Sequence, residues 1–271
     1  MILSAALIIL LGLSAYGFFI EPYQVTISHV WIRDEALSTI LRNRVLVQIS
    51  DLHVSRIGLR EQKILNIVDQ LRPDFIFLTG DYVAWKGDYA AALTFLSHLE
   101  AKIGVWAVMG DYDYSKSRES CLFCHDKDSG IFTRRHRIHF LRNNCEKIIL
   151  DEGVFWIGGK DSEEHHETPY LTELTSQQKK IPVIVLSHIP LLFEQLSDKM
   201  DVLILAGDTH GGQVHLPGWL WKIMGYRKNA LYNYGFFKRG QKKMFVSRGV
   251  GTSHIPLRVC SPPEVVVLHF Y

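Results

Sequence analysis

The chain has 271 residues, of which 47% are hydrophobic, and this is enough to bury the core of one large domain. Its 30 Lys and Arg residues nearly balance its 28 Asp and Glu residues. This balance excludes a general electrostatic attraction to nucleic acid, so no nucleic-acid partner is expected.

The first feature along the chain is an uncharged segment over residues 1–20. About 20 apolar residues are just enough to span a bilayer as a helix. We therefore expect a single-pass membrane anchor, while a cleaved secretory signal and a buried helix stay open as alternatives. Arg33, Arg42 and Arg44 follow the segment, which favours an inner (cytoplasmic) membrane location with the main domain on the cytoplasmic side.

Residues 21–44 are expected to connect this segment to the main domain, beginning with an edge strand over 23–30. From residue 45 onward, β-favouring apolar runs alternate with segments of helical period. The predicted helices cover 60–72 and 88–99, and the predicted strands cover 45–50, 75–79, 105–109, 147–150, 154–158, 182–186, 202–206, 244–247 and 264–270. This order predicts one α/β domain over residues 45–271 with right-handed crossovers.

Residues 115–144 have no clear period and are rich in Arg and His. They are predicted to form a cap-like insertion over the site or a loop. Within them, Cys121, Cys124 and His125 have the C-x-x-C-H spacing of covalent haem attachment, and equally that of half a zinc site. Ordinary thiols are the third reading, and the sequence does not decide among the three.

Acidic and imidazole side chains follow five of the predicted strands. They are Asp51 and His53, Asp81, Asp111 and Asp113, His188, and Asp208 and His210. Groups of this kind at one edge of a sheet would repel and desolvate one another unless a cation lay among them. The pattern therefore predicts a metal centre, with two ions as the favoured number.

The order of these motifs resembles that of the calcineurin-like metallophosphoesterases. The motifs stand here as Asp51-x-His53, Gly80-Asp81, Gly110-Asp-Tyr-Asp113, His188 and Gly207-Asp-x-His210. Two later stretches, residues 209–217 and 246–253, together with 255–258 and 262–264, are similar to the membrane-associated YkuE/YaeI-type bacterial branch. The resemblance implies a four-layer αββα sandwich with the site at the strand ends.

The resemblance also implies a ligand set, position by position. The first ion would take Asp51, His53, Asp81 and His210, and the second would take Asp81, Asp111, His188 and Asp208, with Asp81 bridging. Two divalent ions about 3.5–4 Å apart would hold a bridging hydroxide, orient the phosphoryl group and neutralise its growing charge. A metal-dependent phosphohydrolase that acts on a phosphodiester or a diphosphate is therefore expected.

Three positions depart from the family pattern. Asp111 stands in place of an asparagine, Tyr112 in place of a histidine, and Asp208 in place of the first histidine of the last motif. The two aspartates make the second ligand set richer in oxygen, which favours Mn²⁺, with Mg²⁺ or Fe²⁺ as alternatives to it, over Zn²⁺. A degenerate site that binds one metal or none is the competing interpretation.

Tyr112 bears on the substrate, because a tyrosine is a poorer proton donor at neutral pH than a histidine. A diphosphate expels a phosphate monoester, which needs less acid than an alkoxide does. The expected catalytic residues are Tyr112 and Asp113. His215 and His254 are candidates for the missing acid. Arg248, Arg258 and Gln213 are expected to bind the substrate, although salt bridges are an equal reading for the two arginines.

The expected partner is a phosphate-containing small molecule or a lipid-linked nucleotide at a membrane. Trp219, Leu220, Trp221 and Ile223 would form an apolar lip against the membrane or an acyl chain, or else pack in the core or lid. Related enzymes hydrolyse UDP-2,3-diacylglucosamine in lipid A biosynthesis, and this diphosphate is the most specific substrate that the resemblance suggests. A membrane-associated phosphodiesterase of another substrate and a catalytically weak metal-binding scaffold are the alternative functions.

Overall fold

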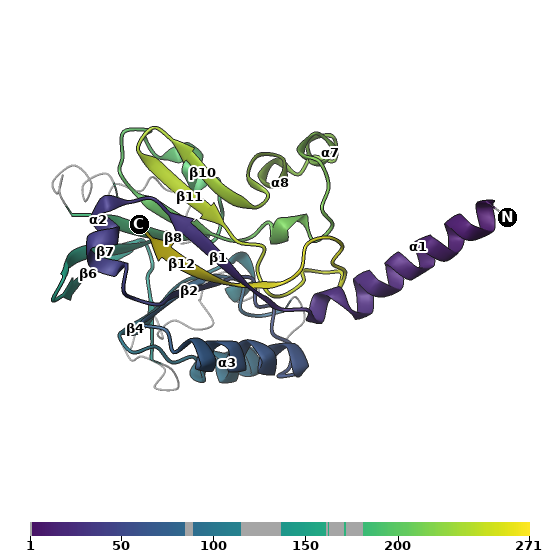
Figure 1. The fold of residues 1–271 in the computed structure, drawn as a ribbon, viewed down its shortest axis with the longest axis horizontal. Coiled ribbons are helices and arrows are strands. Elements are labelled where there is room, and N and C mark those ends of the chain that lie inside the picture. The colour runs from purple at the N-terminus through teal and green to yellow at the C-terminus, as the bar shows by residue number, and fades with distance from the viewer. Residues whose placement is uncertain (1, 85–88, 115–136, 161, 163–170, 172–180) are drawn as a thin grey trace.

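The fold, seen here in a computed structural model, contains two six-stranded sheets (Figure 1). The structure describes all residues except 1, 85–88, 115–136, 161, 163–170 and 172–180. The first sheet has the order β1 (Thr26–Ile32), β12 (Glu264–Phe270), β2 (Leu46–Ile49), β3 (Phe75–Thr79), β4 (Gly104–Val108) and β5 (Ile138–Phe140). The second has the order β10 (Gly235–Arg239), β11 (Lys242–Val246), β9 (Leu203–Ala206), β8 (Val183–Ser187), β7 (Gly153–Lys160) and β6 (Asn144–Leu150).

Helices connect these strands and flank the sheets. They are α1 (Ile2–Phe19), α2 (Glu35–Leu41), α3 (Leu59–Leu71), α4 (Tyr89–Ser97), α6 (Leu192–Gln195), α7 (Gly218–Ile223) and α8 (Arg227–Tyr232). Short 3₁₀ turns lie at Glu21–Tyr23, Asp111–Asp113 and His210–Gly212. The two predicted helices of the first half are confirmed as α3 and α4, with ends that shift by one or two residues.

Three apolar clusters fill the space between the layers of the domain. Because successive side chains of a strand point to opposite faces of the sheet, neighbouring residues belong to different clusters. On β2, Val47 faces the cluster shared with α3 and α4, whereas Leu46 faces the cluster between the two sheets. On β8, Val185 faces a third cluster with α6 and α8, whereas Leu186 faces the space between the sheets. The expected α/β fold with two sheets is therefore confirmed, and helices cover the outer face of each sheet.

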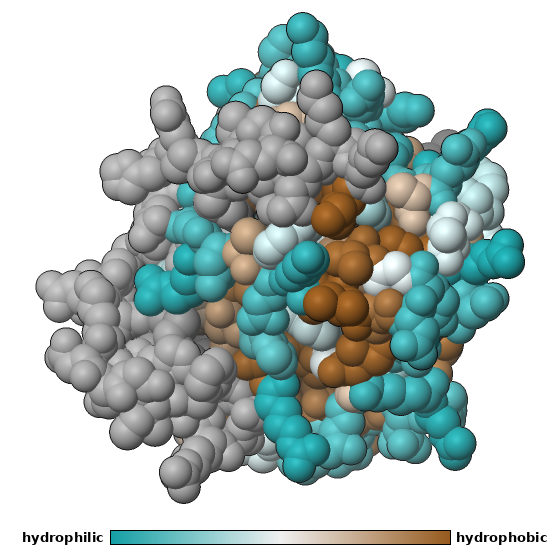
Figure 2. Space-filling model, turned by 90° about the vertical axis from the view of Figure 1, so that its left-hand side faces the viewer, coloured by the Kyte–Doolittle hydropathy of each residue, from teal (hydrophilic) through white to brown (hydrophobic). Residues whose placement is uncertain are grey.

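Strand direction places the functional motifs at one end of the molecule. Strands β2, β3 and β4 are parallel to one another, as are β8 and β9 in the second sheet. Figure 2 views the opposite end, where β6, β7 and the C-terminus lie, and shows apolar side chains gathered in the middle of that face. Because β2 runs antiparallel to β12, its carboxyl end points away from this face.

The N-terminal helix projects from the body of the molecule (Figure 1). Its 18 residues correspond to about 27 Å, slightly less than the ~30 Å hydrocarbon core of a bilayer. Among the residues that the structure describes, no helix has both the length and the apolar character that a membrane crossing requires. The membrane anchor expected over residues 1–20 is therefore not supported.

The segment after α1 contributes to the domain core. Strand β1 pairs in parallel with β12 at the edge of the first sheet. The predicted connector also contains a helix, α2, whose Leu37 and Leu41 are fully buried between the sheets. Asp34 caps this helix by accepting a hydrogen bond from the backbone N–H of Leu37 at 2.9 Å.

The predicted insertion over 115–144 is described only from residue 137 onward. There, β5 extends the first sheet by pairing with β4, and Asn144 begins β6 of the second sheet. This part of the insertion is thus built into the sandwich. Cys121, Cys124 and His125, for which haem attachment, a zinc site and ordinary thiols are the three readings, lie outside the described residues.

Candidate metal centre

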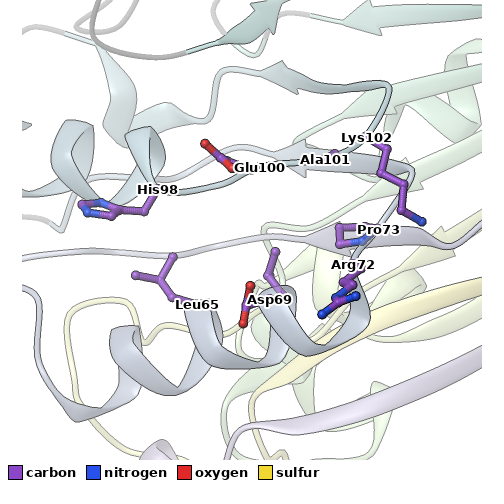
Figure 3. A pocket seen from close by; sticks show the side chains of 9 residues that line it. Leu65, Asp69, Arg72, Pro73, His98, Glu100, Ala101 and Lys102 are labelled. Atoms are coloured by element: carbon purple, nitrogen blue, oxygen red, sulfur yellow. The ribbon is translucent and has the colours of Figure 1, made fainter.

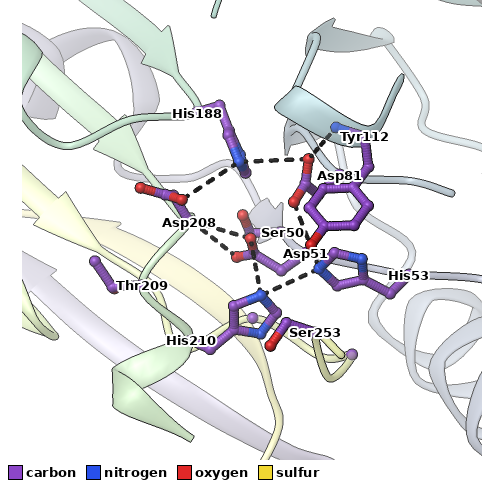
Figure 4. A network of polar contacts seen from close by, with 12 residues as sticks. Ser50, Asp51, His53, Asp81, Tyr112, His188, Asp208, Thr209, His210 and Ser253 are labelled. Carbon is purple, nitrogen blue, oxygen red and sulfur yellow. Dashed lines mark hydrogen bonds and ion pairs between the residues drawn. The ribbon is translucent and has the colours of Figure 1, made fainter. Parts of the chain in front are cut away.

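The predicted ligands meet where strands of both sheets end (Figure 4). Asp51 and His53 follow β2, Asp81 follows β3, and Asp208 and His210 follow β9. All five residues have a left-handed backbone, with φ between 44° and 72°. Non-glycine residues rarely adopt this conformation, and here it turns each side chain out of the strand direction toward a common point.

Glycines allow the loops to approach one another this closely. A Cβ atom at Gly110 would lie 2.1 Å from the Oδ1 atom of Asp81. At Gly207 it would lie 1.9 Å from the hydroxyl oxygen of Ser50 and 2.7 Å from Oδ2 of Asp51. Any larger residue at these two positions would therefore push the ligand carboxylates apart.

One half of the centre consists of Asp51, His53 and His210, whose candidate ligand atoms lie within 4.8 Å of one another. The Nε2 atoms of the two histidines are 3.1 Å apart, and Nε2 of His210 is 3.6 Å from Oδ1 of Asp51. Burial lowers the pKa of His53 to about 4 and that of His210 well below its usual value. Both rings are therefore neutral at pH 7 and present lone pairs, as metal ligands do.

The other half consists of Asp51, Asp81 and His188. Nε2 of His188 lies 3.4 Å from Oδ1 of Asp81, and the second oxygen of Asp81 lies 3.5 Å from His53. Asp81 thus reaches both halves, as a bridging ligand would, and Asp51 belongs to both groups. Burial raises the pKa of Asp51 to about 7. For Asp81, burial would raise the pKa, but the positive charge of nearby His188 outweighs it and lowers the pKa.

Unpaired nitrogen atoms test whether a cation fits this cluster. Nδ1 of His188 donates a hydrogen bond to the carbonyl of Thr79 at 2.8 Å, so its Nε2 carries the lone pair in the neutral ring. That Nε2 is buried without a hydrogen-bond partner and faces oxygens of Asp81 and Asp208 at 3.4 and 3.8 Å. A lone pair that faces two carboxylates requires a proton or a metal ion between them, and the residues fit a divalent ion.

Asp208 and Asp111 lie outside these two groups of three. The ammonium of Lys228 donates a hydrogen bond to Oδ1 of Asp208 at 2.7 Å, and its 2.5 Å contact with Oδ2 is an ion pair without hydrogen-bond geometry. Burial raises the pKa of Asp208. Burial lowers the pKa of Lys228, but the charges of Asp208, Asp111 and Asp81 outweigh it and raise the pKa overall. Lys228 is therefore a charged part of the site.

Tyr112 lies at the mouth of the cluster. Its backbone N–H donates a hydrogen bond to Oδ1 of Asp81 at 3.0 Å, and its ring meets that of His53 edge-on. Its hydroxyl lies 3.1 Å from Nε2 of His254, an exposed residue. Of the two histidines proposed as substitutes for the missing acid, His254 is thus beside Tyr112. Burial raises the pKa of Tyr112, so its hydroxyl stays protonated at neutral pH.

Asp113, expected to be catalytic, is fully buried and holds the loops together. Its two oxygens accept hydrogen bonds from four backbone N–H groups at 2.7–3.3 Å, those of Asp81, Tyr82, Val83 and Gly110. A carboxylate with its oxygens engaged in this way positions Asp81 and does not face a substrate. The structure thus places Asp113 between the loops that carry the ligands, with its oxygens bound to backbone N–H groups.

The three predicted substrate-binding residues also bind other parts of the protein through their side chains. Arg258 is fully buried, and its guanidinium donates to the carbonyls of Gly251, Ser261, Arg248 and Gly249 at 2.6–3.2 Å. Arg248 pairs with buried Glu264 at 2.6 Å. Gln213 binds the backbone of Ser253 and Ile255 and thereby fixes the loop that carries His254. The salt-bridge reading holds for Arg248, and Arg258 binds carbonyls instead.

A separate pocket lies between the ends of α3 and α4 (Figure 3). It is lined on one side by Leu65, Asp69 and Arg72, in α3 and at its end. On the other side it is lined by His98, Glu100 and Lys102, which follow α4. Its lining residues include none of the clustered ligands, and its charges are of mixed sign. It is therefore not a candidate for the chemistry of the metal centre.

Lys228 is the site residue that sequence reasoning missed. It lies 20 residues after Asp208 on a helix too short for a clear apolar period, so no local pattern marks it. The replacement of a neutral histidine by Asp208 was the available signal, because a buried extra carboxylate requires a compensating cation.

Comparison with known proteins agrees with the fold. The sequence profile of the calcineurin-like phosphoesterases matches residues 45–212. The uncharacterized metallophosphoesterase YkuE of Bacillus subtilis is 25% identical over 258 residues, which cover 93% of this chain and 87% of that protein. The phosphodiesterase YaeI of Escherichia coli is 27% identical, with 81% of this chain and 79% of YaeI covered.

A third relative has a named substrate. The UDP-2,3-diacylglucosamine pyrophosphatase LpxG of Chlamydia trachomatis is 26% identical over 275 residues, and 82% of each chain is covered. The matched profile spans most of the chain and includes every predicted metal ligand. The chain therefore belongs to the calcineurin-like phosphoesterase family.

Proposed function

We propose that this protein is a metal-dependent phosphohydrolase that cleaves a phosphodiester or diphosphate bond. The observation that carries the proposal is the convergence of two carboxylates and three imidazoles, in which the buried Nε2 of His188 faces two carboxylates and has no hydrogen-bond partner. Asp51, Asp81, His53, His188 and His210 would hold the metal, with Asp208 and Asp111 beside them. Mn²⁺ is the proposed ion because Asp208 and Asp111, in place of a histidine and an asparagine, add carboxylate oxygens around the imidazoles.

Divalent ions bound there would supply Lewis acidity and a hydroxide at neutral pH. The residues of the chain do the remaining work. Asp113 and Gly110 hold Asp81 in position, and the Tyr112 hydroxyl is placed to donate a hydrogen bond to the transferring phosphoryl group. His254, 3.1 Å from that hydroxyl, would assist a leaving oxygen that does need a proton, such as an alkoxide.

The proposed substrate is a diphosphate, and the most specific candidate is UDP-2,3-diacylglucosamine. Two facts support it: Tyr112 in place of a histidine suits a leaving group that needs little acid, and LpxG, named for that substrate, is a relative over most of the chain. Hydrolysis would release UMP and a lipid monophosphate. The alternative is a phosphodiesterase that acts on another substrate.

A lipid-linked substrate would be met at a membrane surface, and the exposed side of α7 and the turn after it suit such a surface. Trp219, Ile223, Met224 and Tyr226 are 64%, 73%, 43% and 58% exposed, and we call these four residues the α7 apolar face. Two basic residues of the same segment, Lys222 and Arg227, are also exposed. Apolar side chains among basic residues suit an anionic bilayer.

The test is hydrolysis of UDP-2,3-diacylglucosamine and of bis-p-nitrophenyl phosphate, with Mn²⁺, Mg²⁺ or a chelator. We expect metal-dependent release of UMP, and we expect Asp81→Ala to lower the rate at least ~10³-fold because it removes the carboxylate that reaches both half-sites. Asp69→Ala, a change to an exposed aspartate on α3, serves as the matched control and should leave the rate unchanged.

The outcomes separate the candidate functions. Turnover of the aryl diester alone would retain the metal mechanism and discard the lipid-linked substrate. Metal binding without turnover of either compound would favour a scaffold. Full activity of Asp81→Ala would contradict the metal mechanism itself.

A further inference from the structure

Lys228 supplies a positive charge inside a centre that is otherwise acidic. Its ammonium pairs with both oxygens of Asp208, the residue that stands where the family resemblance has a histidine. Relative to that histidine, Asp208 adds one negative charge, and Lys228 adds one positive charge. Together, Asp208 and Lys228 carry no net charge, as the neutral histidine would. The site therefore does not gain a free carboxylate.

The position of Lys228 is fixed by the helix that carries it. Asn229, the next residue, donates to the carbonyl of Thr209 at 3.0 Å. Thr209 in turn donates through its hydroxyl to the carbonyl of Asn233 at 2.6 Å, and Asn233 donates to the carbonyl of Gly211 at 3.0 Å. These bonds tie α8 to the loop that contains Asp208 and His210. Lys228 is thus anchored at the centre and is only about one-third exposed.

We propose that Lys228 is a built-in cation of the metal centre, which holds the Asp208 carboxylate and weakens divalent-ion binding at the half-site of Asp51, Asp81 and His188. A second ion there would have to displace the ammonium from Asp208, or bind with fewer ligands beside a like charge. Oδ1 of Asp208 lies 3.8 Å from Nε2 of His188, which belongs to this half-site and not to that of His53 and His210. The two half-sites therefore bind metal with unequal affinity.

The inference rests on the proposed metal centre and predicts a stoichiometry. The wild-type protein binds one Mn²⁺ tightly and a second at least about tenfold more weakly. Lys228→Met keeps most of the length of the side chain and removes its charge, so it leaves Asp208 free for the ion. In this variant we expect the second site to tighten about tenfold or more while the first changes little.

The experiment is calorimetric titration of the full chain with Mn²⁺, together with electron paramagnetic resonance. The resonance spectrum distinguishes isolated ions from coupled pairs, so the readout does not depend on activity. Lys222→Met on α7, an exposed lysine, is the matched control and should titrate like the wild type. Lys228→Arg retains the charge and should also retain the weak second site. Circular dichroism of each variant verifies folding.

Three results would overturn the inference. They are two equal sites in the wild type, an unchanged second site in folded Lys228→Met, and a weaker second site in that variant. Each of these leaves the metal centre itself in place. By contrast, failure of the wild type and all variants to bind Mn²⁺ would reject the proposed function together with the inference.

Discussion

At the scale of single residues, proton release should accompany metal binding. Burial raises the pKa of Asp51 to about 7, so in the metal-free protein this carboxyl is protonated below pH 7 and ionised above it. A cation must displace the proton at lower pH. We expect Mn²⁺ affinity to fall about tenfold per pH unit below pH 7 and to level off above it.

The measurement is the Mn²⁺ dissociation constant at pH 6, 7 and 8 by calorimetry in two buffers of different ionisation enthalpy. Folding stability of the metal-free protein should change with pH in the opposite direction to the metal affinity. Because the folded pKa of Asp51 exceeds the unfolded value of 3.8, the unfolded chain binds fewer protons between pH 4 and 7. The folded metal-free protein should thus become less stable as the pH rises from 4 to 7. A metal affinity independent of pH would contradict the assignment of Asp51 as a ligand.

His254 carries a second prediction at this scale. If it delivers a proton to the leaving oxygen beside Tyr112, then His254→Gln should slow substrates with poor leaving groups most. We expect a loss of about 10²-fold in kcat for an alkyl phosphodiester and a small loss for bis-p-nitrophenyl phosphate, whose leaving group needs no acid. His215→Gln, also at an exposed position, is the control. Equal losses on both substrates would assign His254 a structural role.

At the scale of elements, α7 yields a prediction about membranes. The protein should co-sediment with vesicles that contain anionic lipid and bind vesicles of neutral lipid less, with an affinity that falls as salt rises. Trp219→Ser combined with Ile223→Ser should weaken binding at least tenfold, because burial of two such side chains contributes about 3–6 kcal/mol. Ile149→Ser removes an exposed apolar side chain of β6 instead and should have no effect. Unchanged binding by the double variant would exclude the α7 apolar face.

Elements with strong local patterns were predictable from the sequence. Strands β3 and β12 have the predicted bounds, and β2, β4, β8 and β9 differ by one or two residues. Their residues are almost all buried, so continuous apolar runs mark them. The short helices α2, α7 and α8 and the strand β10 went unpredicted because five to seven residues carry too little periodicity. Their positions depend on tertiary contacts.

At the scale of the whole molecule, the candidate site was predictable as a set of ligands and less so as a set of roles. The motifs placed acidic and imidazole groups at parallel strand ends, and topology brings such ends together. Whether an arginine near the site faces substrate or protein depends on contacts between distant loops. Arg258 illustrates this, because its carbonyl partners come from residues 248–251 and 261. The pairing of Lys228 with Asp208 likewise exists only in three dimensions.

The left-handed backbone at the ligands has a consequence for how such a chain persists through mutation. Five non-glycine residues in this conformation, at Asp51, His53, Asp81, Asp208 and His210, cost of order 1–3 kcal/mol each, even though aspartate and histidine tolerate it better than most. Glycine at any of them would relieve the cost in a single substitution. Selection for stability alone would therefore favour glycine at these positions, and the five side chains would persist only where the proposed ligand set is in use.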